Sequence, residues 1–231
     1  MPQQNPIQIP IMTAPQSMLA EDGPKVALIL AAEVAFARDG IDGASLREIA
    51  AKAGQRNHHA VQYHFGSCES LVQAVFDYRM DQMEAARGAA LEAARKSGEL
   101  GTTRLIAEAI FLPQIAMIDE YGDNSYAAFL SAYLLRYQGS RFGEFGERIA
   151  PHLGQILQML RGRMANLPET VAQRRLVTAC FMFLNILIIY TRGGGAGAES
   201  FEAALGDTLD QIVLTLEAPY VAQRSSGLRF I

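Results

Sequence analysis

Three of the chain's four histidines fall within seven positions, at His58, His59 and His64. Imidazole side chains bind metals, transfer protons or hydrogen-bond a polar partner. His59 and His64 are five residues apart and His58 and His64 are six apart, so neither pair has the i, i+4 spacing that places two ligands on one helix face. Residues 54–67 also contain no carboxylate or thiol. This pattern disfavours a metal site and favours contact with a polar partner or solvent, with a structural hydrogen bond as the alternative for His64.

The other reactive side chains do not form a catalytic set. Cys68 stands in the first turn of a predicted helix, where the dipole lowers a thiol pKa, so it is either a redox sensor or a small tolerated residue. Cys180 lies in the most apolar run and is expected to be inert. The glycine-rich stretch 193–197 lacks the Lys-Ser/Thr ending of a phosphate loop and is expected to be a flexible connection. We therefore expect no enzymatic activity, no cofactor and no metal.

The histidine segment lies among short predicted helices. A first helix is expected from Pro24, a residue suited to a first turn, to a stop at Gly40. Ser45-Leu46-Arg47-Glu48 has the form of a capping box, and Gly54 ends this second helix. Asn57 is the expected N-cap of a short third helix to about Tyr63, and Ser67 is the expected N-cap of a long fourth helix.

The remainder of the chain keeps the helical period and becomes more apolar. Residues 1–23 are rich in Pro and Gln and are expected to form a disordered arm. No segment alternates with period two for long, so the predicted fold class is all-α. The helices expected beyond residue 94 are 102–119, 124–138, 145–165, 168–192 and 199–217.

The second and third predicted helices, joined by a tight turn at Gly54, form a helix-turn-helix pattern. Such a unit presents the start of its second helix to base edges in the DNA major groove. Between residues 45 and 64, the cations Arg47, Lys52 and Arg56 face the single acid Glu48. The chain as a whole carries a net charge of −4, but charge acts locally, so this segment modestly suits DNA.

Residues 25–76 resemble the DNA-binding domain of the tetracycline-repressor (TetR) family of bacterial transcription regulators. The matching pieces are LILAAEVAFARDG (28–40), SLREIAAKAG (45–54) and AVQYHFGSCESLVQAV (60–75). The resemblance implies a homodimer whose paired N-terminal domains read a palindromic operator. It also implies a helix-turn-helix domain at 24–66 and a ligand-binding and dimerisation domain at 67–231, linked by the helix from Ser67.

By position, the resemblance assigns DNA contacts to the second and third helices and their turn. Arg47 matches a DNA-reaching residue at the start of the second helix, and Tyr63 and His64 match an aromatic and an imidazole that contact the backbone. The stretch 54–61 is one residue longer than the common family spacing, Gln62 stands where many relatives have Tyr, and Cys68 replaces a usual Lys. The full expected DNA-binding set is Arg47, Arg56, Asn57, His58, His59, Gln62, Tyr63 and His64.

The C-terminal domain holds two further expected sites. Aromatic bulk mixed with polar tips suits an apolar ligand cavity, although the same residues at helical spacing are also what a helical core contains; the set is Phe111, Gln114, Met117, Tyr126, Phe129, Tyr133 and Tyr137. Apolar faces on the last two helices suit a four-helix dimer contact; the set is Phe181, Phe183, Leu184, Ile188, Leu209, Ile212 and Leu216.

No signal peptide is predicted, because residues 1–20 carry no charged side chain and are interrupted by prolines. The most apolar run, 177–190, is too short to span a bilayer and is expected to be a buried helix. With two cysteines far apart in sequence, we expect a reduced cytoplasm and no membrane partner.

The sequence thus predicts a ligand-responsive DNA-binding transcription regulator. In this interpretation a homodimer represses from a palindromic double-stranded DNA operator until a small apolar or aromatic effector releases it. A helical small-molecule-binding or interaction protein with weakened DNA binding is the alternative, favoured by Cys68 and the acidic net charge. An enzyme that uses the histidine cluster is the remaining rival, and it lacks a nucleophile.

Overall fold

The computed structural model describes residues 23–137, 150–191 and 199–220. Over these ranges the regular elements are helices and no strand occurs, which confirms the predicted all-α class. The elements are α1 (Gly23–Asp39), α2 (Leu46–Lys52), α3 (Ala60–Phe65), α4 (Cys68–Ser97), α5 (Thr103–Phe111), the 3-10 helix η2 (Leu112–Ala116), α6 (Ser125–Arg136), α7 (Pro151–Arg163), α8 (Glu169–Thr191) and α9 (Phe201–Glu217).

Capping residues explain where several helices begin. Ser45 accepts a hydrogen bond from the backbone N–H of Glu48 at 3.4 Å, and Ser67 accepts one from Ser70 at 3.0 Å. Each bond satisfies an N–H that the first helical turn leaves without an intrahelical partner. Thr102, Asn124 and Ser200 cap α5, α6 and α9 in the same way.

The third helix starts later than the sequence suggested. The Asn57 side chain accepts the N–H of His59 at 2.9 Å, but the Ala60 N–H bonds to the Asn57 carbonyl, which closes a tight turn. The α-helix proper begins at Ala60 and continues to Phe65, beyond the predicted end near Tyr63. Asn57 therefore caps a turn that leads into α3, and His58 and His59 lie in that turn.

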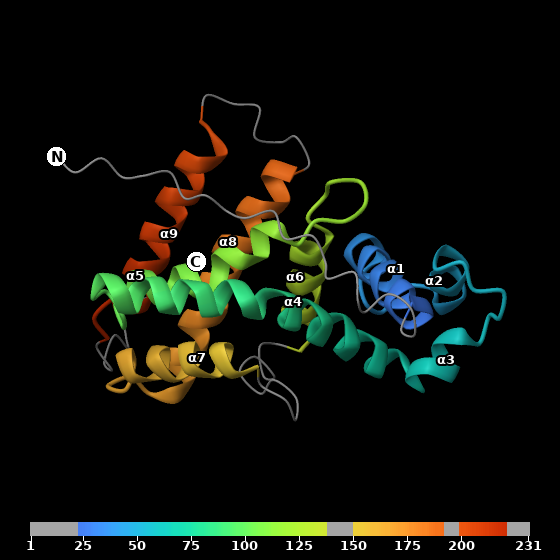
Figure 1. The fold of residues 1–231 in the computed structure, drawn as a ribbon, viewed down its shortest axis with the longest axis horizontal. Coiled ribbons are helices and arrows are strands. Elements are labelled where there is room, and N and C mark those ends of the chain that lie inside the picture. The colour runs from blue at the N-terminus through green and yellow to red at the C-terminus, as the bar shows by residue number, and fades with distance from the viewer. Residues whose placement is uncertain (1–22, 138–149, 192–198, 221–231) are drawn as a thin grey trace, which may run out of the picture.

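The long helix α4 connects the two halves of the molecule (Figure 1). Helices α1, α2 and α3 gather at one end of α4, and α5, α7, α8 and α9 lie toward its other end. Helix α6 packs closely against α1 and also against α8, so it lies between the two groups. One apolar core runs through both halves, from Leu28 and Phe36 in α1 to Phe183 in α8.

A buried polar network joins α1, α4 and α6 inside this core. The Glu33 carboxylate accepts hydrogen bonds from Arg79 Nε at 2.6 Å and Arg79 Nη2 at 2.7 Å. The Ser125 hydroxyl also donates to Glu33, at 2.6 Å. Since Glu33 is 1% exposed and Arg79 5%, this ion pair is buried and hydrogen-bonded, as buried charges must be to persist.

Helix α8 forms a longer apolar element than the sequence run 177–190 implied. Residues Glu169–Tyr190 are long and apolar enough to cross a membrane by length and composition alone, and 33% of the most apolar window is buried. The run 177–190 covers only part of this length, and α8 corresponds to the predicted helix 168–192. In this fold α8 packs against α6 and α9, and Arg175 donates to the Leu216 carbonyl at 3.1 Å.

The predicted C-terminal helices agree with the observed ones where both are described. The predicted segment 102–119 divides into α5 and η2, because Pro113 occupies the start of the 3-10 helix. Residues 138 and 145–149 of the predicted segments, the arm over 1–22, and the glycine-rich stretch 193–197 lie outside the described residues.

Candidate functional site

The expected DNA-binding residues form one exposed surface at the end of the molecule. Two buried residues, Ala60 and Val61, fix α3 against the core. The side chains that point away from this anchor are exposed, and Tyr63 is 82% exposed. Of the eight expected residues, Arg47, Arg56, Asn57, His58, His59, Gln62 and Tyr63 are exposed, and His64 is partly buried.

Two glycines shape the ends of the helix-turn-helix. Gly54 has φ of +70° and Gly66 has φ of +77°, a region that L side chains rarely adopt. Gly54 turns the chain out of α2, and the Gln55 N–H returns to the Ala50 carbonyl at 2.9 Å. Gly66 ends α3 and leads directly into α4. The two glycines therefore shape the turn before α3 and the turn after it.

Aromatic and cationic groups surround the end of α3. The Tyr63 and His64 rings meet edge to face, with centroids 5.0 Å apart, and Lys25 Nζ of α1 lies 5.7 Å from the centroid of the Phe65 ring. This arrangement holds His64 beside the exposed Tyr63 ring. Because the Tyr63 ring is so exposed, a partner can stack on it or hydrogen-bond its hydroxyl.

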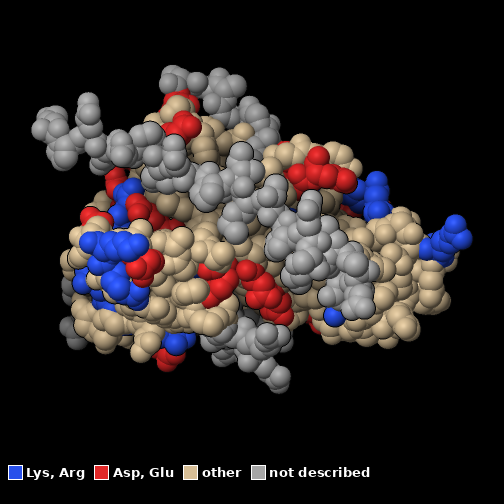
Figure 2. All heavy atoms as spheres, viewed as in Figure 1, with Lys and Arg blue, Asp and Glu red and all other residues tan. Residues whose placement is uncertain are grey.

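The single acid of the helix-turn-helix is paired with an arginine of α1. Glu48, the single acid of residues 45–64, accepts from Arg38 Nη2 at 3.0 Å, and Arg38 also pairs with Asp39. Its charge is therefore partly balanced by a cation of α1. Figure 2 shows Lys and Arg side chains at the end formed by α2 and α3, and Asp and Glu side chains grouped over the middle of α4.

Cys68 does not have the environment of a reactive thiol. It is the first residue of α4 and is partly buried against the core. Burial, followed by the neighbouring charge of Glu69, raises the pKa of the Cys68 thiol, opposite to the lowering expected from the helix dipole alone. A raised pKa leaves less thiolate, the species that reacts with oxidants, so the structure does not support the redox-sensor alternative.

The exposed helix-turn-helix surface is matched by a known family model. Residues 28–75 match the N-terminal model described as bacterial regulatory proteins, tetR family. This part of the chain is similar to the N-terminal domain of that family. The match spans α1, α2, α3 and the first part of α4, and it supports the interpretation of the chain as a DNA-binding regulator of transcription.

Two further comparisons gave a weak structural similarity and no match among curated proteins. A solved transcriptional regulator from Rhodococcus sp. Rha1 is 22% identical, with a TM-score of 0.44 over 85% of this chain and 99% of that one. No curated protein matched the chain.

A second candidate site is a small internal cavity of about 20 Å³ beside α4. Its walls come from α4, α5, α6, α7 and α8 together with η2, so most helices of the C-terminal part contribute to it. The lining residues are Phe76, Met80, Arg87, Ile110, Gln114, Leu130, Leu153, Leu157, Leu176 and Cys180.

Of the seven residues expected to form a ligand cavity, Gln114 is among those that line it. The aromatic residues instead form stacked and tilted contacts in the core: Phe36 meets Phe129, Phe76 stacks on Tyr133 at 5.2 Å, and Phe111 stacks on Phe183 at 5.2 Å. Neighbouring helices fill the space between these rings, and the assignment of the set to a ligand site stays a prediction. The expected residues outside the lining are Phe111, Met117, Tyr126, Phe129, Tyr133 and Tyr137.

Arg87 is the functional candidate that the sequence interpretation missed. It lines the cavity and is 1% exposed. Its signal was present in the sequence, since Met83, Arg87 and Leu91 follow one another at four-residue spacing on the buried face of α4. A charged residue within an apolar stripe is rarely buried without a partner and so marks a site.

The expected dimer residues are mostly covered within the single chain. Phe183, Leu184, Leu209, Ile212 and Leu216 are each at most 4% exposed, because α8 and α9 pack against each other. These five side chains are therefore core residues of the single chain, and their assignment to a dimer interface stays a prediction. Phe181 and Ile188 are partly buried. The large apolar side chains that α8 and α9 expose are Ile189 at 40% and Leu214 at 70%.

Proposed function

We propose that the chain is a ligand-responsive repressor that binds a palindromic operator as a homodimer and leaves it when a small-molecule effector binds. The observation that carries this proposal is the position of α6. This helix contributes Leu130 to the cavity wall and contacts the DNA-binding helices at both of its ends.

At its N-terminal end, α6 is attached to α1. Ser125 donates to Glu33, and Asn124 Nδ2 donates to the backbone carbonyl of Gln114 at 3.1 Å. Gln114 in turn lines the cavity. A ligand that displaces η2 therefore acts on the residues that hold α1.

At its C-terminal end, α6 reaches the base of the recognition unit. Arg136 pairs with Asp42 in the α1–α2 connection and with Glu69 in the first turn of α4, the latter at 2.6 Å. The Tyr137 hydroxyl also donates to Glu69. Movement of α6 along its axis thus changes how α2 and α3 are held relative to the C-terminal helices.

Linkage then explains release. An effector that prefers a conformation with wrongly spaced recognition helices weakens operator binding, and DNA weakens effector binding by the same factor. Helix α4 belongs to the same coupling, because it starts directly after α3 and contributes Phe76, Met80 and Arg87 to the cavity.

For the DNA contacts, we assign base reading to His59 and Gln62 and backbone contact to Tyr63 and His64. Exposure of the first three side chains and the polar character of all four support this assignment. Arg47 and Arg56 supply charge for phosphates, which dominates affinity without specifying sequence.

For the dimer, we assign the outward face of α8 and α9 around Ile189 and Leu214. Two helices from each subunit make a four-helix contact with two-fold symmetry. A two-fold dimer presents its recognition helices to two half-sites of a palindrome.

The test is a salt-titrated binding assay of the full chain on its own upstream DNA against a random duplex, with sedimentation at micromolar concentration. We expect a dimer that binds the upstream site in preference to random DNA. A monomer, or equal weak binding to both duplexes at every salt concentration, would refute the proposal.

A further inference from the structure

The cavity contains a cation without a counter-ion. Arg87 Nη1 donates to the Met80 carbonyl at 3.2 Å, and Nη2 lies 3.5 Å from Met80 Sδ and 3.7 Å from Met83 Sδ. Arg87 Nε is buried without a hydrogen-bond partner. Within the described residues no carboxylate oxygen lies within 4.0 Å of this guanidinium, although a buried charge is stable only when paired.

Among the described residues, the nearby carboxylates form no ion pair with Arg87. Glu84, one turn before Arg87 on α4, accepts the backbone N–H of His152 in the first turn of α7 at 2.5 Å through Oε1, and its Oε2 has no hydrogen-bond partner. Glu33 is already bound by Arg79 and Ser125. Burial lowers the Arg87 pKa, and the charge of Glu84 offsets this lowering only in part.

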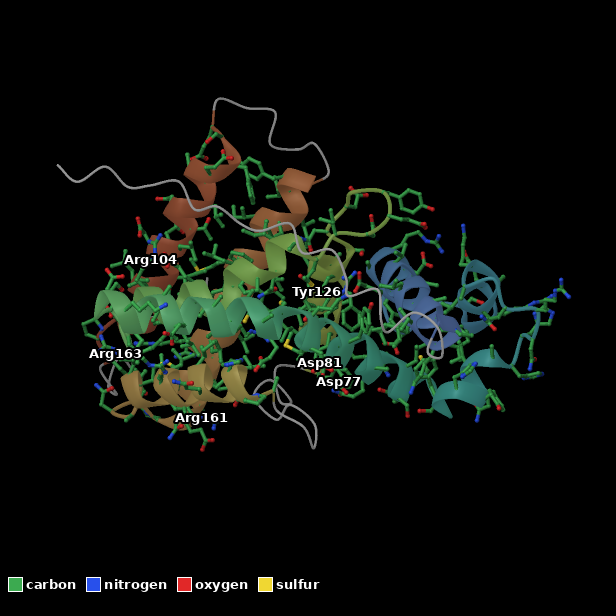
Figure 3. All side chains as sticks on the ribbon, in the orientation of Figure 1. Asp77, Asp81, Arg104, Tyr126, Arg161 and Arg163 are labelled. Carbon is green, nitrogen blue, oxygen red and sulfur yellow. The ribbon has the colours of Figure 1, made fainter. Side chains whose placement is uncertain are left out.

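Two further polar groups of the C-terminal core are unsatisfied, and one of them, Gln114, lines the cavity. The Tyr126 hydroxyl and Gln114 Oε1 are buried and lack hydrogen-bond partners. Figure 3 shows Tyr126 in the interior beside α4 and α6. Burial raises the Tyr126 pKa, and the positive charge of Arg87 opposes this rise, so the two groups are close enough to interact electrostatically. Orphaned buried groups of this kind call for a missing partner.

We propose that the effector cavity binds a small monocarboxylate with an apolar body, its carboxylate held by Arg87. This inference rests on the proposed ligand response. A guanidinium fork matches the two oxygens of a carboxylate, and the amide of Gln114, which also lines the cavity, supplies a further donor. The leucines and Phe76 and Ile110 of the lining surround the apolar body.

The chemistry favours a carboxylate over a phosphate. One guanidinium balances one negative charge, whereas a phosphate brings up to two charges into an apolar lining that cannot solvate the second. The amide of Gln114, whose bond to the Ile110 carbonyl is long at 3.4 Å, is free to reorient toward the ligand.

The cavity volume makes binding a conformational event. About 20 Å³ accommodates little more than one water, so a carboxylate with an apolar body must push the lining apart. The unbranched Met80 side chain yields readily. Displacement beyond it reaches η2 and α6, the elements that hold α1.

The first measurement needs no ligand. Urea unfolding of the full chain is compared for wild type, Arg87→Met and the control Arg95→Met, an exposed arginine of the same helix. If Arg87 awaits a ligand anion, removing the unpaired charge raises the unfolding midpoint, and the control leaves it unchanged. A midpoint below wild type for Arg87→Met would show a structural arginine and overturn the inference.

The second measurement is calorimetric titration with hexanoate, hexanamide and inorganic phosphate. Wild type should bind hexanoate at least about tenfold more tightly than hexanamide and should not bind phosphate. Arg87→Met should lose the preference, and Gln114→Leu, which removes the amide from the cavity lining, should weaken hexanoate binding. Equal binding of acid and amide, binding of phosphate alone, or no heat with hexanoate would each show a cavity that holds a buried water only or another ligand class.

Operator release separates this inference from the proposed function. Hexanoate that binds at Arg87 but leaves operator affinity unchanged supports the carboxylate site and contradicts the ligand response. A neutral compound that releases the operator while hexanoate does not bind supports the response and overturns the carboxylate site.

Discussion

Replacing Glu33 with alanine should destabilise the protein more than any surface charge substitution. The change removes the carboxylate that accepts three hydrogen bonds, two from Arg79 and one from Ser125, at 2.6 to 2.7 Å. Arg79 would keep Gln82 Oε1 at 2.9 Å and the weak acceptor Met117 Sδ at 3.9 Å. The guanidinium would then remain buried without a counter-charge.

Breaking one partner of a buried ion pair costs about 3–5 kcal/mol. For a chain of this size each kcal/mol lowers Tm by roughly 2–4 °C, which gives a drop of roughly 6–20 °C. This loss is a large part of a typical free energy of unfolding of about 5–15 kcal/mol. The double variant Glu33→Ala/Arg79→Met should be more stable than Glu33→Ala alone, because it removes both charges together.

The assay is urea and thermal unfolding followed by far-UV circular dichroism at fixed protein concentration, since the proposed dimerisation would make stability concentration-dependent. The chain contains no Trp, so near-UV tyrosine signals provide the second probe that a two-state analysis needs. The matched control is Glu92→Ala, which breaks exposed pairs with Arg95 and Lys96 on the same helix α4 and should cost about 0–1 kcal/mol. If Glu33→Ala behaves like this control, the buried network does not hold α1 to α4 and α6.

Four other outcomes follow from the described surfaces. Gln62→Ala should lose discrimination between operator and random DNA by about 1–3 kcal/mol per half-site, and equal losses on both duplexes would show that this side chain does not read bases. Cys68→Lys should tighten binding to any DNA and, with one new phosphate contact per subunit, steepen the log–log salt slope by roughly 1.8 units; an unchanged slope would show that this position does not face the backbone. Because the Cys68 pKa is raised, wild-type protein at pH 8 should react with iodoacetamide more slowly than a free cysteine peptide, whereas a faster rate would contradict the described environment. Leu214→Glu, a charge placed on the outward face of α9, should shift sedimentation toward monomer, and an unaffected dimer would place the interface elsewhere.

The sequence allowed the helix-turn-helix to be predicted because local rules govern it. Ser45, Gly54 and Ser67 act through bonds and backbone angles within a few residues, so their roles are legible without tertiary information. The delayed start of α3 is a local competition that the pattern did not resolve. Asn57 accepts the N–H of His59 as a cap does, yet the chain forms a tight turn before the helix begins.

The cavity and the dimer face were not predictable in the same way, because both depend on which helices become neighbours. The spacing of Phe111 and Phe129 is compatible with either a core or a pocket. In the fold, Phe183 packs on Phe111 and Phe36 packs on Phe129, so these rings belong to the core. Likewise Leu209 and Ile212 are covered by the same chain. The sequence shows Arg87 as a charged residue within an apolar stripe. Whether Arg87 has an ion-pair partner depends on where Glu84 and Tyr126 lie in the folded chain.

The buried Glu33, Arg79 and Ser125 network also limits how the protein can be recombined with its relatives. A chimera that receives its DNA-binding domain, up to Ser67, from a relative would lose Glu33. It would keep Arg79 and Ser125, which lie after the exchange point. Unless the donor domain supplies an acid at the same place on its first helix, the hybrid inherits a stranded guanidinium in its core. The N-terminal domain therefore depends on residues of α4 and α6 that lie outside it. A chimera should exchange α3 alone, or carry Glu33, Arg79 and Ser125 together.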